Sequence, residues 1–276
     1  VLDRRSLNDI TRLIVLLITS KESHMKKFIC KYYKLLVASV LIIALIEYGL
    51  GAYAKNYYHA GATSADALLS DDIVTVDKVS KRHEKTITFS PENPTKGLIF
   101  YPGTKVEYTA YAPLLHEFAR NGYVCMVIHM PYNLAILDKN AADKYIDPLK
   151  EKYKTVKQWY VGGHSSGGAM AASYAAKNTD KIDGLFLFAA YSTSDLSDSG
   201  LSVYSVYGSN DKVLNIKNYN KYKKNLPKDL HEFVIDGGCH SYFGNYGLQK
   251  GDGDPDITMD EQIQTTIDFI ESENAG

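Results

Sequence analysis

From residue 72 onward the chain alternates short apolar runs with amphipathic segments and contains no internal repeat. Six of the runs are almost continuously apolar, which is typical of central parallel strands buried on both faces. These runs are 97–101, 123–130, 159–162, 184–189, 202–207 and 232–235. Two earlier runs, 73–79 and 85–89, alternate polar with apolar residues and predict an antiparallel pair that leads into the sheet.

Helical periodicity fills the spaces between the later strands. The expected helices are 111–121, 141–154, 168–177, 216–224 and 259–272. Because strands and helices alternate with short connections, the pattern predicts an α/β fold with a doubly wound, mostly parallel sheet of eight strands. We expect this fold to occupy a single domain, 72–276.

The N-terminal part of the chain follows a different pattern. Positive charge at Lys26, Lys27 and Lys31 directly precedes the uncharged stretch 35–46, an order typical of an export signal or anchor. When extended to Ala54, the apolar stretch reaches the roughly 20 residues that a membrane-spanning helix needs. The sequence therefore predicts an N-terminal hydrophobic helix that contacts the membrane.

Two outcomes stay open for residues 25–54. A signal peptidase could cut at the small-x-small site 52–54 and release the protein, or the helix could remain as a signal anchor. We favour the anchor, and the basic residues before position 35 then predict a catalytic domain on the extracellular face. Residues 1–24 are interpreted as an upstream extension, and the polar, small-residue-rich segment 55–71 as a flexible linker.

Composition narrows the classes of function. With 45% hydrophobic and 23% charged residues, the 276-residue chain can bury a full core in one large domain. A net charge of −1 without a dense basic stripe gives no electrostatic footprint for nucleic acid. Three cysteines without zinc-ligand spacing indicate neither a disulfide framework nor a metal site. We therefore expect no cofactor, no metal and no nucleic-acid partner, and the sequence does not indicate an oligomeric state.

A candidate nucleophile lies between a strand run and a helix run. Ser165 is the centre of Gly-His-Ser-Ser-Gly, residues 163–167, which is a G-x-S-x-G pattern. A serine at the tip of a strand-to-helix turn has a strained backbone, and the flanking glycines remove the side chains that would collide there. The pattern alone is common, but its position between strand and helix indicates a nucleophile elbow.

A serine hydroxyl needs a base, and a histidine base needs an orienting carboxylate. Asp211 and His240 each follow one of the last two strand runs, His240 on a glycine-rich loop. The carboxyl ends of parallel strands meet at one edge of an open α/β sheet, so Ser165, Asp211 and His240 are expected to converge there. Asp236 remains the alternative orienting carboxylate.

Other residues near this edge receive structural interpretations. His164 is expected to pack beside the elbow, and His129, at a strand end, to be structural. Cys239 is interpreted as an inert thiol, with a pairing to Cys125 as the alternative. The acidic segment 251–256 lacks the ligand pattern of a calcium loop and is interpreted as a solvated turn.

Attack on an ester carbonyl builds negative charge that backbone N–H groups must stabilise. The N–H of Ser166, the residue after the nucleophile, is one expected donor. The N–H of Thr104, in the loop after the run 97–101, is expected to be the second donor of this oxyanion hole.

Four motifs together resemble the α/β-hydrolase superfamily: Tyr-Pro-Gly at 101–103, Gly-His-Ser-Ser-Gly-Gly at 163–168, Gly-Ser-Asn-Asp at 208–211 and Gly-Gly-Cys-His at 237–240. The chain is similar to a compact, lidless, exported group related to dienelactone hydrolases, in which an aromatic residue and a glycine, here Phe243-Gly244, follow the histidine loop. Dienelactone hydrolases carry a cysteine nucleophile, so their substrate is not carried over to Ser165. Only ten residues, 191–200, lie where such enzymes insert a cap, and no cap domain is expected.

The resemblance implies hydrolysis of carboxylic esters or related acyl bonds through an acyl-enzyme on a Ser-His-Asp triad. An open site suits a small-molecule or surface-linked acyl ester, and Tyr242 and Phe243 are expected to line its wall. An acyltransferase would use the same residues, so that alternative stays open. A catalytically silent, envelope-tethered binding domain is the third hypothesis.

Overall fold

The computed structural model describes residues 4–81 and 84–274 and divides into two units, Val1–Tyr53 and Ala54–Gly276. The described residues of the first unit all belong to helix α1, Arg4–Ala54. Its part Met25–Tyr53 contains an 18-residue window with a mean hydropathy of 2.2 and is long and apolar enough to cross a membrane, and a signal sequence would meet the same test. The predicted N-terminal apolar helix is therefore present. Its role as anchor or signal, like that of 1–24, stays a prediction.

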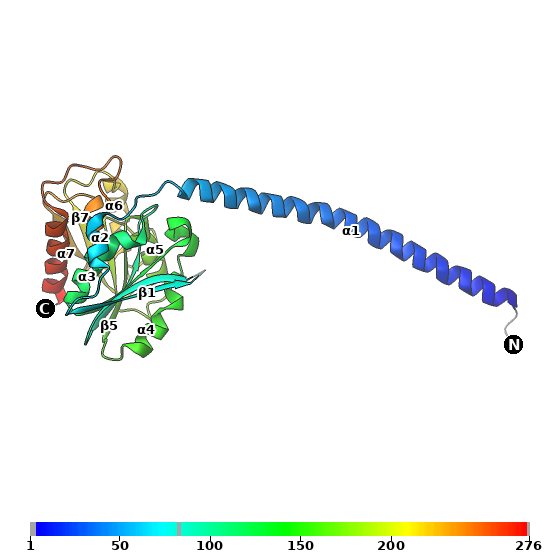
Figure 1. The fold of residues 1–276 in the computed structure, drawn as a ribbon, viewed down its shortest axis with the longest axis horizontal. Coiled ribbons are helices and arrows are strands. Elements are labelled where there is room, and N and C mark those ends of the chain that lie inside the picture. Colours follow the sequence, from blue (N-terminus) through cyan, green and yellow to red (C-terminus); the bar gives the residue numbers. More distant parts are fainter. Residues whose placement is uncertain (1–3, 82–83, 275–276) are drawn as a thin grey trace. The chain divides into compact units, whose positions relative to one another are not determined.

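The second unit contains one sheet of eight strands (Figure 1). The strands are β1 Val74–Lys81, β2 Glu84–Pro91, β3 Lys96–Tyr101, β4 Tyr123–Ile128, β5 Gln158–His164, β6 Gly184–Phe188, β7 Ser202–Gly208 and β8 His231–Ile235. Their order in the sheet is β1-β2-β4-β3-β5-β6-β7-β8. Only the β1–β2 and β2–β4 pairs are antiparallel, so the predicted mostly parallel sheet with an antiparallel leading pair is confirmed.

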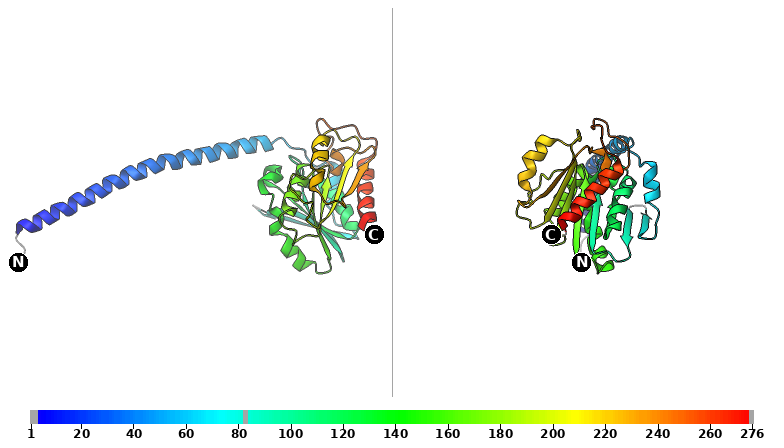
Figure 2. Two further views of the ribbon diagram at one scale, coloured as in Figure 1. Left: turned by 180° about the vertical axis from the view of Figure 1, so that it is seen from behind. Right: turned by 90° about the vertical axis from the view of Figure 1, so that its left-hand side faces the viewer.

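Among the described residues of this unit, six α-helices are present: α2 Ala62–Ala67, α3 Ala112–Arg120, α4 Ile146–Lys152, α5 Ser166–Ala175, α6 Ile216–Tyr222 and α7 Met259–Asn274. Helices α3 and α7 lie on one face of the sheet, and α4 and α5 lie on the other (Figure 2). Their side chains form one core with each face. This is the predicted doubly wound arrangement. Among the described residues, no separate cap domain covers the sheet.

The helix predicted at 141–154 is divided. A 3-10 turn at Ala141–Lys144 precedes α4, which begins only at Ile146. Pro148 explains the break, because proline has no N–H to donate to the carbonyl of residue 144 and is tolerated only within the first turn of a helix.

The segment 55–71 differs from the predicted flexible linker. Residues 56–61, which we call the strap, lie on the loop that follows β3. The Tyr58 N–H donates to the Lys105 carbonyl oxygen over 2.7 Å, and the Glu107 N–H donates to the Tyr58 carbonyl oxygen over 2.9 Å. These bonds form a short parallel bridge, so the strap is part of the folded domain.

Residues after the strap are also packed. The Gly61 N–H donates to the Asn245 carbonyl oxygen over 2.7 Å, and α2, which follows directly, buries Ser64 completely. Small residues in this segment permit close packing and do not confer flexibility here. The folded domain therefore begins within a few residues of the end of α1.

Candidate active site

Ser165 occupies the turn between β5 and α5. Its backbone lies at φ 55° and ψ −128°, a region that residues with a Cβ avoid, and its N–H donates to the Phe188 carbonyl oxygen over 2.9 Å. A Cβ at Gly163 would lie 2.6 Å from the Tyr101 carbonyl oxygen, and one at Gly167 would lie 2.2 Å from the same atom. Glycine is required at both positions because β3, β5 and α5 meet too closely for any side chain.

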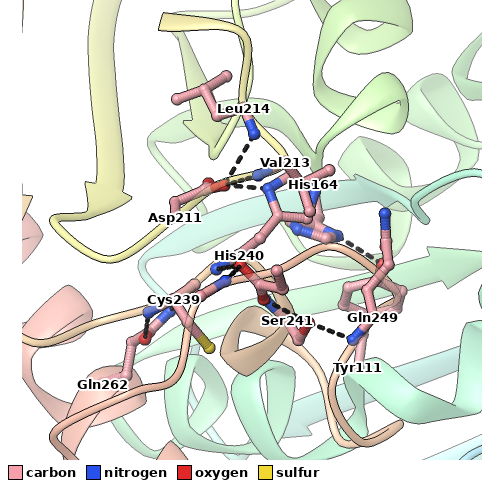
Figure 3. Close-up of polar contacts among 12 residues, drawn as sticks. Tyr111, His164, Asp211, Val213, Leu214, Cys239, His240, Ser241, Gln249 and Gln262 are labelled. Carbon is pink, nitrogen blue, oxygen red and sulfur yellow. Dashed lines mark hydrogen bonds and ion pairs between the residues drawn. The ribbon is translucent and has the colours of Figure 1, made fainter.

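Asp211 and His240 form a buried, hydrogen-bonded pair at the edge of the sheet where the parallel strands end, which we call the carboxyl edge (Figure 3). His240 Nδ1 lies 2.8 Å from Asp211 Oδ2, and each side chain is 1% exposed. The other carboxylate oxygen accepts two backbone N–H groups of the following turn, over 2.8 and 2.7 Å. The alternative carboxylate, Asp236, accepts a hydrogen bond from the Ser209 hydroxyl instead.

Ser165 and His240 line the same cavity, with a volume of about 340 Å³. His240 Nε2 is buried, and no described residue forms a hydrogen bond with it, the Ser165 hydroxyl included. Catalytic hydrogen bonds are often long until a substrate closes the site. Because Nδ1 is engaged by Asp211, Nε2 is the ring nitrogen that is left to accept a proton.

A second cavity, of about 360 Å³, borders Ser165 on the side of the β3 loop. Its wall combines the strap with that loop and a residue that follows the His240 loop: Asn56, Tyr57, Tyr58, Gly103, Thr104, Lys105, Val106 and Gln249. The first cavity is more apolar, with Ala169, Met170, Ala189, Ala190, Val213 and Leu214 in its wall. The candidate nucleophile therefore lies between two cavities of different character.

The two predicted oxyanion donors lie beside each other. Ser166 is the first residue of α5, and the Thr104 N–H donates to Ser166 Oγ over 3.0 Å. The two hydroxyl oxygens lie 2.5 Å apart. A substrate oxyanion that accepts a hydrogen bond from the Thr104 N–H must therefore displace the Ser166 hydroxyl, which accepts that hydrogen bond in this structure. The preceding residue is fixed, because the Gly103 N–H donates to the Tyr111 hydroxyl over 2.9 Å.

His164 packs directly against His240, with ring centroids 4.5 Å apart. Its Nδ1 lies 2.9 Å from the Tyr111 hydroxyl, which accepts from the Gly103 N–H and so has its own proton available for Nδ1. Burial, and after it the charge of His240, holds the pKa of His164 well below its usual value. His164 is therefore a neutral packing partner that adds no second positive charge beside His240.

Two side chains hold the loop that carries His240. Gln262 of α7 accepts from the Cys239 N–H and donates to the Cys239 carbonyl oxygen, each over 2.9 Å (Figure 3). Asp252 accepts from the His240 N–H over 3.2 Å and from the N–H and hydroxyl of Ser241 over 2.8 and 2.6 Å. Burial raises the pKa of Asp252, but the hydrogen bonds from Ser241 and the neighbouring backbone outweigh it and hold the pKa below its usual value.

Sequence reasoning missed both of these residues. The segment 251–256 is only partly the predicted solvated turn: Gly251, Asp254 and Asp256 are exposed, but Asp252 supports the His240 loop. A Cβ at Gly253 would lie 1.9 Å from the Asn210 carbonyl oxygen. No local pattern in an acidic loop shows which carboxylate folds back onto the protein. Gln262 does carry a signal, since it shares the face of α7 that buries three isoleucines, and a buried amide needs partners.

The predicted wall residues Tyr242 and Phe243 line neither of the two cavities at Ser165. The chain after His240 turns as a short 3-10 helix, Ser241–Phe243, which directs Phe243 into the core. There its ring stacks on Phe188 with centroids 5.4 Å apart. The aromatic residues in the cavity walls come instead from the strap and from Tyr191.

Among the described residues, no group of three His, Cys, Asp or Glu side chains is placed to hold a metal ion. Cys125 and Cys239 are both free and buried. Burial, and after it the nearby Asp252 carboxylate, raises the pKa of Cys239 to about 12. Cys239 is therefore an inert thiol beside His240 and not a second nucleophile.

Comparison with known proteins agrees with this fold. The model of the alpha/beta hydrolase family matches residues 97–264, and the chain belongs to that family. Comparison with curated proteins gives no match.

Three solved structures share the fold at low identity. Carboxyl esterase 2 from the fungus Tuber melanosporum is 11% identical, with a TM-score of 0.57, over 78% of this chain and 89% of that one. A thermophilic esterase from Thermogutta terrifontis is 14% identical, with a TM-score of 0.50, over 73% and 91%. A candidate dienelactone hydrolase from Klebsiella pneumoniae is 12% identical, with a TM-score of 0.55, over 72% and 97%.

Proposed function

We propose that the protein is a serine hydrolase that cleaves carboxylic esters through an acyl-enzyme. The observation that carries this proposal is the buried His240–Asp211 pair, whose histidine lines the same cavity as Ser165, a residue at a strained strand-to-helix turn. Membership of the alpha/beta hydrolase family and the esterases among the structural relatives support a hydrolase.

The mechanism assigns one step to each group. His240 Nε2 takes the Ser165 proton as the serine oxygen attacks the acyl carbonyl, and Asp211 orients the imidazole and stabilises the imidazolium. The N–H groups of Ser166 and Thr104 stabilise the oxyanion of the tetrahedral intermediate. His240 then protonates the leaving alcohol, and water attacks the acyl-enzyme in the same way to release the acid and restore Ser165.

The cavities favour an ester whose two parts differ in polarity. The more apolar cavity beside α5 suits the acyl group, and the cavity under the strap suits the alcohol or its attachment point. We further propose that α1 anchors the protein with its basic N-terminal side inside the cell and the folded domain on the extracellular face.

Covalent labelling and turnover test the proposal together. The full chain in detergent should hydrolyse p-nitrophenyl acetate and react with a fluorophosphonate probe. Ser165→Ala should abolish labelling and lower kcat by about 10⁶-fold, the loss found when a triad serine is removed. Ser173→Ala, on the same helix, is the control and should retain both properties.

An unlabelled and inactive parent protein with an intact fold would contradict the proposal and favour the silent binding domain. Product analysis with competing alcohols separates hydrolysis from acyl transfer, because a transferase would form the new ester in preference to the free acid.

A further inference from the structure

The wall of a cavity at Ser165 begins directly after the apolar helix. Helix α1 ends at Ala54, and the strap residues Asn56, Tyr57 and Tyr58 already line the cavity of about 360 Å³. The chain therefore passes from a segment able to cross a membrane to the candidate active site with no spacer between them.

The strap is held in place on the domain. Besides the bridge to the β3 loop, the Tyr58 hydroxyl accepts the Lys250 N–H over 3.1 Å, and the Tyr58 ring lies 5.6 Å from that of Tyr246. Whatever the direction of α1, the four chain steps from Ala54 to Tyr58 span at most about 14 Å. A free linker over 55–71 would have reached about 60 Å, so the folded strap confines the cavity to the neighbourhood of the helix end.

Several exposed apolar side chains lie at the carboxyl edge of the sheet. Ile136 and Leu137 follow β4 and are 67% and 44% exposed, and Ile216 lies two residues after Leu214 of the apolar cavity wall. Leu248, also exposed, adjoins Gln249 of the other cavity wall. Ile136 and Leu137 lie in a 3-10 turn after β4, Ile216 begins α6 after β7, and Leu248 follows β8, so all four come after the carboxyl ends of strands.

The other large apolar side chains exposed among the described residues of this unit lie elsewhere. Leu69 and Ile73 precede β1, which runs parallel to β4, so they lie at the opposite edge of the sheet. Val234 lies within the edge strand β8. Apolar side chains grouped at one edge indicate a surface that contacts an apolar partner, and α1 supplies the reason that this partner is a bilayer.

We propose that α1 stays in place as an anchor, that the carboxyl edge faces the bilayer surface, and that the substrate is a long-chain acyl ester held in the membrane. This inference rests on the proposed function. The acyl carbon–oxygen bond of the lipid is cleaved, its alcohol leaves with the proton that His240 took from Ser165, and water then releases the fatty acid from the serine. The acyl chain occupies the apolar cavity beside α5, and the headgroup side lies under the strap.

Lengthening the chain between α1 and the strap tests whether α1 holds the candidate active site at the bilayer surface. The full chain is placed in phosphatidylcholine vesicles, with 4-methylumbelliferyl oleate dissolved in the bilayer and p-nitrophenyl acetate in the water. An insert of about twenty Gly/Ser residues between Ala54 and Lys55 should lower oleate hydrolysis about tenfold, because effective concentration falls steeply with the length of a flexible link. Acetate hydrolysis should be unchanged, and the same insert placed before Val1 should change neither rate.

A second pair of variants tests the surface itself. Ile136→Ser combined with Leu137→Ser should lower oleate hydrolysis several-fold and leave acetate hydrolysis unchanged, while Leu69→Ser, at the opposite edge, should leave both rates unchanged. Equal oleate rates with and without the insert, or a mature protein that begins at Lys55, would overturn the inference. Absence of acetate hydrolysis by the parent protein would instead overturn the proposed function.

Discussion

At the residue scale, Asp211 determines which ring nitrogen of His240 is available to accept a proton. Its carboxylate accepts the His240 ring N–H and two backbone N–H groups, and the side chain is 1% exposed. A carboxylate in this position keeps the proton on Nδ1 and leaves Nε2 to act as the base. An asparagine of the same shape can offer its amide N–H to the ring and so favours the opposite tautomer.

Asp211→Asn should therefore lower kcat for p-nitrophenyl acetate by about 10⁴-fold with little change in KM, because only the orientation and tautomer of the base are lost. Steady-state kinetics measure the loss, and circular dichroism checks the fold. Asp236→Asn serves as the control and should stay close to the parent. A larger loss in Asp236→Asn than in Asp211→Asn would reverse the assignment.

Cys239 gives a second prediction at this scale. Its pKa of about 12 leaves almost no thiolate near neutral pH, and Cys125 is buried with its pKa raised well above the usual value. In a Cys30→Ser variant, iodoacetamide should label neither thiol until denaturant is added. Intact-mass spectrometry counts the labels, and modification of the folded protein would show that Cys239 is reactive.

At the scale of elements, α5 approaches the β3 loop so closely that one methyl group is disruptive. A Cβ at Gly167 would lie 2.2 Å from the Tyr101 carbonyl oxygen and 2.3 Å from that of Pro102. Gly167→Ala should displace the loop that carries Thr104, cost about 1–3 kcal/mol of stability as overpacking does, and lower kcat as well. Urea unfolding and kinetics test this, with Lys177→Ala near the exposed end of the helix as the neutral control.

The loop that carries His240 depends on a carboxylate whose pKa is lowered in the folded protein from a usual value of 3.8. The stability that Asp252 contributes is therefore complete above about pH 4 and is lost as the pH falls through the lower, folded-state pKa. Asp252→Asn should cost about 1–3 kcal/mol near neutral pH, the cost of unmade buried hydrogen bonds. Its stability should also fall less steeply in acid.

Urea titrations between pH 7 and pH 3 compare the two proteins, with the exposed Asp254→Asn as the matched control. Parallel pH profiles for the parent and Asp252→Asn would show that the carboxylate does not hold the loop.

Elements that follow local periodicity were predictable, and those that depend on distant partners were not. The eight strands could be predicted because burial of the sheet requires apolar residues along them. The elbow could be predicted because the crowding around Ser165 requires glycine at the flanking positions. The strap could not, since its partners lie near residues 106, 245 and 250, far away in the sequence. The inward direction of Phe243 depends on a turn that no periodicity signals. The Asp211 assignment needed coordinates, because Asp236 lies closer to His240 in sequence.

At the scale of the whole molecule, the domain has the cores it needs without α1. Both apolar cores consist of residues after position 73, and the earliest residues packed against them belong to the strap and α2. The strap adds three backbone hydrogen bonds and one wall of a cavity at Ser165. The two segments therefore contribute in separable ways. We expect α1 to determine where the protein is located, while the strap stabilises the folded domain and forms part of the candidate active site.

A protein that begins at Lys55 should unfold in one cooperative step with the same urea midpoint as the full chain in matched detergent. A protein that begins at Ala62 loses the strap and should be less stable by about 3 kcal/mol, since each backbone hydrogen bond contributes about 1 kcal/mol net. It should also hydrolyse p-nitrophenyl acetate more slowly, because the cavity beside Thr104 loses its wall. Equal stability of the two shortened proteins would show that the strap is a passive tether, and the site would then be independent of the chain that joins it to α1.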